Sequence, residues 1–149
     1  MLRRPLLFLP AIALANCAGP KPPPSVEIAV TGAANQNPDS AGRGAPVAVS
    51  IFKLTATAKF ERADVFALTE REAATLGADS AGSEQFVIGP GEARTITREL
   101  PLTVRFIGAV ALFRDIDRST WRGVVPIADS GLTKLKLTLN GTTLSLVKA

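Results

Sequence analysis

Alternation of apolar and polar side chains divides most of the chain into short segments of the kind that form β-strands. Residues 25–31 alternate cleanly, with their valines and isoleucine on one face, which predicts a strand buried on one side. Residues 47–54 and 103–113 are apolar on both faces, which predicts strands at the centre of a sheet. Further strands are predicted at residues 85–88, 94–100, 121–127, 134–139 and 142–147.

The period of the pattern changes between residues 59 and 76. Phe60, Ala63 and Ala67 recur at helical spacing, as do Val65 and Leu68, and charged residues supply the opposite face. This pattern predicts one helix or two short ones, and such a stripe more often packs on a sheet than docks a partner. Seven or eight short strands, interrupted by a helical insertion after the second strand, predict a mainly β fold, a β-sandwich.

Two of the segments that connect predicted strands, a long loop and a tight turn, can be recognised from their residue types. Residues 32–46 form a long loop, nearly free of large apolar side chains, and loops of that length are often functional or disordered. Its turn-forming groups, Asn-Pro-Asp at 37–39 and Gly-Arg-Gly at 42–44, offer donors and acceptors but are also common shapers of turns. Asn140-Gly141 predicts a tight hairpin through a type I′ turn, because both residues tolerate a positive φ.

The N-terminus has the three parts of a secretory signal: arginines at 3 and 4, an apolar run from 6 to 15, and Leu-Ala-Asn-Cys at 14–17. Cys17 is the only cysteine and stands where a lipoprotein carries its diacylglycerol. We therefore predict a signal peptide over 1–16, a lipidated Cys17 with a proline-rich tether over 17–24, and one domain over 25–149. Asn16 departs from the small residue usual at that position, and the alternative is an ordinary signal cut after Ala13 or Ala15. Ala18, which is not acidic, favours sorting to the outer membrane.

Composition removes several classes of function. The chain has no histidine and no tyrosine, so it cannot build a Ser-His-Asp or Cys-His arrangement or bind zinc through imidazole. Asp115 and Asp117 lack the ligand pattern and the glycine of a calcium loop. The formal net charge of +4 includes the two arginines of the signal, and no basic stripe with interleaved aromatics indicates nucleic acid. We expect a protein that is not an enzyme and has no cofactor or metal.

Several motifs, in a fixed order, resemble the outer-membrane lipoprotein family of type VI secretion systems, known as TssJ, VasD or SciN. The lipobox and tether are followed by Asn-Pro-Asp at 37–39, Gly-Arg at 42–43 and a strand that ends Phe-Lys-Leu at 54. Each motif is weak alone, and their order and spacing make the resemblance specific. The remaining motifs are Phe60, residues 63–68 and 76–79, Pro-Gly-Glu at 90–92, residues 108–111 and 113–115, and Trp-Arg at 121–122.

The resemblance implies a transthyretin-like β-sandwich without catalytic chemistry. Members of the family sit on the inner leaflet of the outer membrane, with the domain in the periplasm. There they hold the periplasmic C-terminal domain of an inner-membrane partner, TssM, within a multimeric envelope complex. The loop between the first two strands is a main contact for that partner, which here corresponds to residues 32–46. The implied partner-binding residues are Asn35, Asn37, Pro38, Asp39, Gly42 and Arg43.

The sequence also leaves open two alternative functions and two roles for Trp121. A lipoprotein with the same sandwich could bind a small ligand or polysaccharide, for which an aromatic-lined pocket would be the mark. An envelope enzyme would need an acidic pair in a cleft. Trp121 beside Arg122 is either an interface hot spot or, more commonly for a lone tryptophan near a strand start, a packing residue at the edge of the core.

Overall fold

Two four-stranded β-sheets pack face to face in the computed structural model, which describes residues 5, 10 and 19–149. The first sheet has the order β4-β1-β7-β8 and the second the order β3-β2-β5-β6. Only the neighbours β1 and β7 are parallel. The strands are β1 (Pro24–Gly32), β2 (Val47–Leu54), β3 (Ser80–Ile88), β4 (Ala93–Glu99), β5 (Phe106–Ala111), β6 (Arg122–Pro126), β7 (Gly131–Asn140) and β8 (Thr143–Lys148).

The alternating pattern places one face of each strand in the core. Val26, Ile28 and Val30 of β1 are all at most 1% exposed, and their neighbours on β7 continue the same apolar layer. The centres of the two sheets are β1 with β7 and β2 with β5, as the apolar runs at 47–54 and 103–113 predict for the second sheet. The predicted β-sandwich of seven or eight strands is thus confirmed, with eight.

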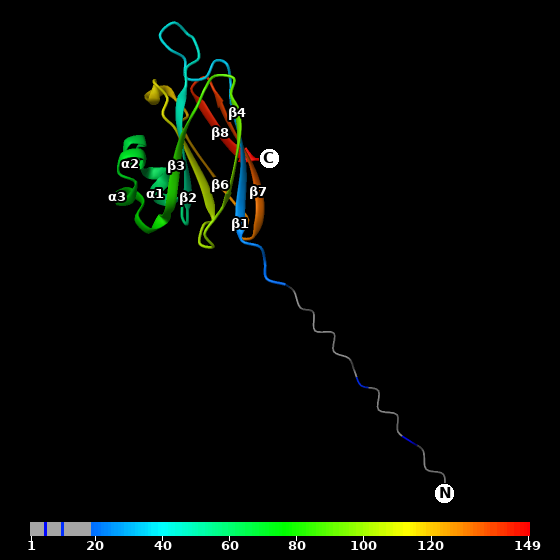
Figure 1. Cartoon of the computed structure of the whole chain (residues 1–149). Helices are drawn as coiled ribbons and strands as arrows, with labels where there is room; N and C mark the ends of the chain where they lie inside the picture. The colour runs from blue at the N-terminus through cyan, green and yellow to red at the C-terminus, as the bar shows by residue number, and fades with distance from the viewer. Residues whose placement is uncertain (1–4, 6–9, 11–18) are drawn as a thin grey trace.

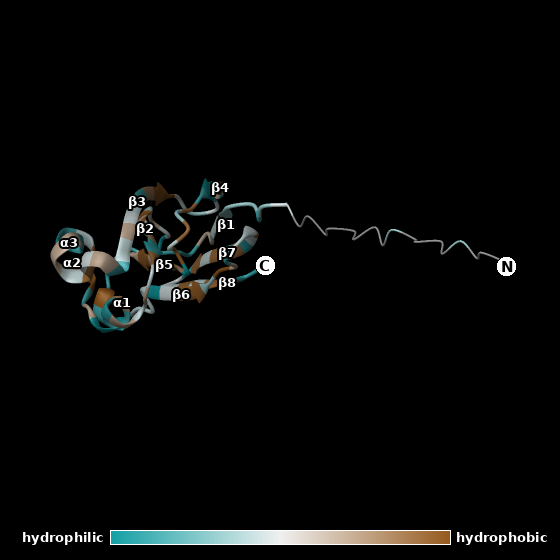
Figure 2. Cartoon of the chain, turned by 90° about the horizontal axis from the view of Figure 1, so that it is seen from below, coloured by the Kyte–Doolittle hydropathy of each residue, from teal (hydrophilic) through white to brown (hydrophobic). Residues whose placement is uncertain are grey.

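Three short helices cover the outer face of the second sheet (Figure 2). They are α1 (Ala58–Arg62), α2 (Val65–Glu70) and α3 (Glu72–Leu76), followed by the single turn η1 (Gly77–Asp79). Phe60 is fully buried and its ring lies 5.3 Å from that of Phe52. Asp64 begins α2, because its side chain accepts a hydrogen bond from the Ala67 N–H at 2.8 Å. The segment predicted as one helix or two therefore contains three short helices. The helical insertion after the second strand is confirmed, and its apolar stripe is core.

The two ends of the sandwich differ in what they carry (Figure 1). At the end that we call the base, the chain enters β1 from the N-terminal segment, and the β4–β5 and β6–β7 connections lie beside it. At the opposite end, the tip, lie the loop 33–46, the segment 112–121 with η2 (Ile116–Arg118), and the β3–β4 and β7–β8 turns. β1 therefore runs the length of the domain, from the base to the loop 33–46.

The β7–β8 hairpin differs from the type I′ turn expected at Asn140-Gly141. Asn140 is the last residue of β7 and pairs with Thr143, so the two turn residues are Gly141 and Thr142. Among them only Gly141 has a positive φ, 57°, which is the pattern of a type II′ turn. The predicted hairpin is right and its predicted turn type is wrong, because the pairing is shifted by one residue.

The predicted signal peptide and the lipidation site Cys17 lie outside the residues that the structure describes. Within the described residues, none of the helices has the length and apolar character needed to cross a membrane. The last residues of the proline-rich segment that was predicted as a tether are part of the domain or bonded to it. Pro24 is the first residue of β1, and the Pro22 carbonyl accepts a hydrogen bond from Gly131 N–H at 3.3 Å.

Candidate partner-binding loop

Backbone hydrogen bonds hold the first part of the loop 33–46 to the sandwich. Ala33 N–H donates to the Leu139 carbonyl at 2.8 Å, and Asn37 N–H donates to the Gly141 carbonyl at 2.7 Å. Across the loop, Ala45 N–H donates to the Gln36 carbonyl at 2.9 Å. The Asn35 carboxamide oxygen accepts from Gly141 N–H at 3.3 Å. The loop is therefore anchored on the β7–β8 turn rather than tethered only through its own strands.

Asn37 is the residue that fixes the path of the loop. It has a φ of 45°, the left-handed conformation that asparagine tolerates better than most residues, and it is 4% exposed. Its side-chain Nδ2 donates to the Pro46 carbonyl at 2.9 Å, and its Oδ1 accepts from Arg114 N–H at 2.8 Å. Asn37 thus joins the start of the loop, its end and the segment 112–121, and its side chain has no free polar group to offer to a partner.

Gln36 is buried beneath the loop, although it is not among the residues predicted to bind a partner. The side chain is fully buried, with Nε2 donating to the carbonyls of Ile88 at 2.8 Å and Ala45 at 3.2 Å. Its Oε1 lies so close to Gly32 that a side chain at position 32 would place a carbon 2.3 Å from that oxygen. In the sequence Gln36 is one polar residue among other polar residues of a loop, and this pattern does not predict whether its side chain is buried or exposed.

The outer part of the loop is a tight turn built around Asp39. Its Oδ1 accepts from the N–H groups of Ala41 and Arg43, each at 2.9 Å, and Gly42 N–H donates to the Asp39 carbonyl at 2.9 Å. The Arg43 guanidinium lies 3.4 Å from Oδ2 and its side chain is 81% exposed. The hydrogen bond from the Arg43 amide, aided by that from Ala41 and by the charge of Arg114, lowers the pKa of Asp39. The turn is thus ordered while its charges face solvent.

The structure brings the six predicted partner-binding residues together in one loop but does not expose all of them. Asn35, Gly42 and Arg43 are exposed, Pro38 and Asp39 are half-buried, and Asn37 is buried. Next to them the segment 112–121 adds the exposed charged residues Arg114, Asp115, Asp117 and Arg118. The tip therefore presents a small surface of mixed charge on a rigid support.

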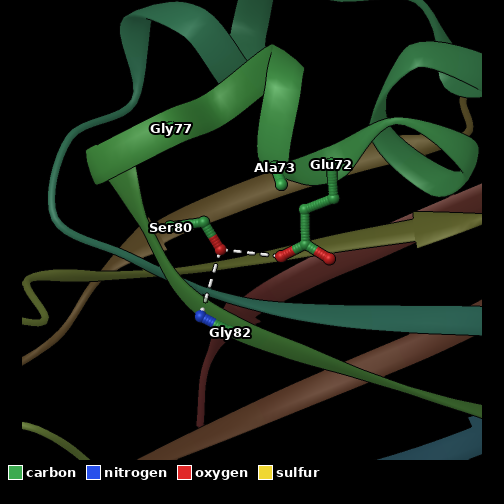
Figure 3. Close-up of a pocket in the computed structure, with 5 residues that line it drawn as sticks. All are labelled: Glu72, Ala73, Gly77, Ser80 and Gly82. Atoms are coloured by element: carbon green, nitrogen blue, oxygen red, sulfur yellow. Dashed lines mark hydrogen bonds between the residues drawn. The ribbon is translucent and has the colours of Figure 1, made fainter.

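A shallow depression of about 350 Å³ lies between α3 and β3 (Figure 3). It is lined by Glu72, Ala73, Gly77, Ser80 and Gly82, without an aromatic residue. The Glu72 carboxylate accepts from the Ser80 hydroxyl at 2.7 Å and from the Ser83 hydroxyl, and Gly82 N–H donates to the Ser80 oxygen at 3.1 Å. These bonds attach α3 to β3, so the arrangement is structural and lacks the aromatic platform of a sugar site.

Arg122 has a packing role with Trp121. One guanidinium nitrogen, Nη1, donates to the carbonyls of Phe60 and Ala63, each at 2.8 Å, where α1 ends. The guanidinium also lies over the Trp121 ring, 4.3 Å from its centroid. Burial lowers the pKa of Arg122. Of the two readings of this pair, the structure supports packing at the edge of the core.

Within the part of the chain that the structure describes, no group of acidic or cysteine side chains has the arrangement of a metal site. The described part of the chain is thus a two-sheet β-sandwich with an ordered, charged loop at one end. The chain belongs to the type VI secretion lipoprotein family: the family model described as "Type VI secretion lipoprotein, VasD, EvfM, TssJ" matches residues 24–142. This family is a structural component of the secretion system, and the resemblance drawn from the motifs is confirmed.

Solved structures agree with this assignment. The T6SS lipoprotein TssJ1 from Pseudomonas aeruginosa is 38% identical, with 86% of this chain and 98% of that chain covered and a TM-score of 0.83. Lip from Serratia marcescens, a membrane-bound component of the type VI secretion system, shares the fold at 23% identity, 85% and 98% coverage and a TM-score of 0.73. No curated protein matches the chain.

The fold also occurs in two further solved structures. A structure described as the T6SS protein TssM C-terminal domain (869–1107) from EAEC contains a chain that matches at 23% identity, 84% and 98% coverage and a TM-score of 0.71. One described as a type VI membrane complex matches at 23% identity, 83% and 97% coverage and a TM-score of 0.70.

Proposed function

We propose that this chain is an outer-membrane anchor of a type VI secretion membrane complex. Acyl groups on Cys17 hold it in the inner leaflet of the outer membrane, and the sandwich projects into the periplasm. There the loop 33–46 binds the periplasmic C-terminal domain of an inner-membrane protein of the TssM kind. The observation that carries the proposal is the position of an ordered loop at the end of the domain opposite the N-terminal segment.

The family and its structural neighbours support the choice of partner. The family model describes a type VI secretion lipoprotein, and chains of this fold are present in structures described as a TssM C-terminal domain and as a type VI membrane complex. An anchor in a contractile machine needs slow dissociation. A loop that is already ordered loses little conformational entropy on binding, which favours such an interface.

Within the loop, the residues have two different roles in this proposal. The exposed or half-buried groups, Asp39 and Arg43 above all, contact the partner, with Asn35, Pro38 and Gly42 beside them. Asn37 holds the loop in shape from beneath. Its buried amide bonds only to the domain itself.

Calorimetric titration of the isolated domain tests the proposal. Residues 19–149 contain both apolar cores, which begin at Val26, and the titrant is the periplasmic C-terminal domain of the TssM-like protein of the same organism. We expect saturable binding that is weakened at least severalfold by Arg43→Ala. This change removes an exposed guanidinium and leaves the backbone bonds of the turn in place. The matched control is the double change Glu27→Ala and Lys134→Ala, which removes an exposed pair 3.9 Å apart on the outer face of the first sheet.

The outcomes separate the role from the surface. Binding that survives Arg43→Ala and also survives shortening of the loop keeps the role and moves the interface elsewhere. Absence of binding, with both domains folded, removes the proposed partner and favours the ligand-binding lipoprotein. For the anchor itself, a Cys17→Ser variant that still fractionates with membranes would contradict lipidation.

A further inference from the structure

The base of the sandwich lies close to any membrane that holds Cys17. The Pro22 carbonyl accepts a hydrogen bond from Gly131 N–H and Pro24 opens β1, so four residues, 18–21, separate Cys17 from the first residue bonded to the sandwich. Five fully extended residue spacings, from 17 to 22, reach about 17 Å. The base therefore stays within that distance of the headgroups, whatever the direction of the linker.

The base carries the most exposed large apolar side chain among the described residues. Leu102 is 70% exposed, and it lies in the turn 101–104 that joins β4 to β5. The turn is closed by the hydrogen bond from Val104 N–H to the Pro101 carbonyl, 3.0 Å. Leu132, at the start of β7, is 50% exposed and pairs with Ser25 at the point where the chain enters β1 (Figure 1).

Charged groups of both signs flank these leucines. Arg105 Nη1 donates to the carbonyls of Leu102 at 2.6 Å and Val104 at 3.0 Å, which places its charge beside the turn and stiffens it. Lys134 is 63% exposed, and Lys21 is exposed in the linker itself. The acidic residues at this end are Glu99 and Asp129, both exposed, and Glu27, which partly offsets Lys134. The base thus carries charges of both signs in equal number around its exposed leucines, and exposed apolar side chains at this position suit the boundary between headgroups and acyl chains.

We propose that the base is a membrane-contacting surface, with Leu102 inserted into the leaflet that holds the acyl chains of Cys17. The occupant is a lipid surface. The length of the linker requires this surface to be near, and the exposed leucines of the base suit its apolar interior. This inference rests on the proposed lipidation of Cys17 and adds a second point of attachment to it.

Two points of attachment fix the orientation of the domain. A flexible single anchor would leave the sandwich free to tilt, whereas contact at the base directs β1 away from the membrane. The nine residues of β1 span about 30 Å at the usual rise of a strand, which sets the loop 33–46 about that far from the leaflet. The binding loop then faces across the periplasm.

A pair of single-cysteine variants of the full chain tests the contact. Leu102→Cys places a label at the base, and Ser40→Cys places a matched label on the exposed part of the tip loop. Once Cys17 is acylated, the introduced cysteine is the only reactive thiol, because the chain has no other. Each lipidated variant is labelled with an environment-sensitive fluorophore and reconstituted into vesicles of phosphatidylethanolamine and phosphatidylglycerol.

We expect a blue-shifted emission at Leu102, quenching by a lipid-attached quencher, and at least severalfold lower quenching by iodide than at Ser40. Equal iodide quenching at the two positions overturns the inference. Protection of the Leu102 label without quenching from the lipid also overturns it, because protein then covers the base. Failure of the chain to stay with the vesicles would refute the lipid anchor as well. Partner binding by residues 19–149 is measured without lipid, so a failure of the membrane contact can be told apart from a failure of the proposed partner binding.

Discussion

Replacement of Asn37 tests how the loop 33–46 is held in shape. In Asn37→Gly, the backbone keeps its freedom to adopt the φ of 45°, and only the side-chain bonds to the Pro46 carbonyl and Arg114 N–H are lost. Each such bond contributes about 1 kcal/mol net, so the free energy of unfolding should fall by about 2 kcal/mol. In Asn37→Ala, the Cβ adds the cost of the left-handed conformation, about 1 kcal/mol. The total loss for alanine is then about 3 kcal/mol.

Urea unfolding of residues 19–149, followed by the fluorescence of Trp121, measures both variants against the parent domain. Asn37→Asp tests the donor separately, because its Oδ1 can still accept from Arg114 N–H while a carboxylate oxygen replaces the donor to the Pro46 carbonyl. We expect its loss of stability to be larger than that of glycine, because the buried carboxylate oxygen faces a carbonyl oxygen. Equal stability of the alanine and glycine variants would refute the role of the backbone conformation. Losses below about 0.5 kcal/mol in both would refute the role of the hydrogen bonds, since surface changes commonly fall in that range.

Three further predictions concern packing and charge. Gly108→Ala would place a methyl group 2.7 Å from the Phe60 ring, so α1 must shift. The free energy of unfolding in urea should fall by about 1–3 kcal/mol. An unchanged free energy of unfolding would show that the ring moves freely. Arg122→Met keeps the stem but loses two hydrogen bonds, so the melting temperature of the domain should fall by about 4 °C for each kcal/mol lost. An unchanged melting temperature would contradict the packing role. The pKa of Asp39 in the folded domain is below its ordinary value of 3.8. The Asp39 carboxylate therefore stabilises the turn fully above pH 3.8, and this stabilisation is lost as the pH falls through the lowered pKa. An NMR titration of the Arg43 amide with a midpoint at or above 3.8 would contradict this.

The fold could be predicted from the sequence wherever side-chain alternation is strong. β1 and β2 are found at almost their true bounds, because burial of one or both faces leaves a clear pattern. β3 begins at Ser80 rather than 85, and its first half, Ser-Ala-Gly-Ser-Glu, contains no large apolar residue. As an edge strand it pairs with β2 through the backbone, and such pairing leaves little trace in the side chains.

The candidate site was predictable as a segment and not as a set of side-chain roles. The length and polarity of residues 32–46 mark a loop, and the turn around Asp39 follows from its residue types. The burial of Gln36 and Asn37 depends on carbonyl and amide groups that belong to Ile88 and Arg114, more than 50 residues away. No local pattern encodes such contacts. The same limit applies to Arg122, whose acceptors lie on α1.

The topology also explains how the domain can carry tension in the proposed role. β1 connects the linker directly to the loop 33–46, so a pull between the lipid and the partner passes along one strand that is already extended. The pairing of β1 with β4 on one side and β7 on the other keeps the strand in place without bearing the main load. Pulling on residues 19–149 by handles at Lys21→Cys and Ser40→Cys should release only the loop. Handles at Lys21→Cys and Ala149→Cys should unfold the whole domain at lower force, because β8 is an edge strand that can be peeled from β7. Unfolding of the whole domain at similar force in both geometries would show that the load passes through the sheet and not along β1.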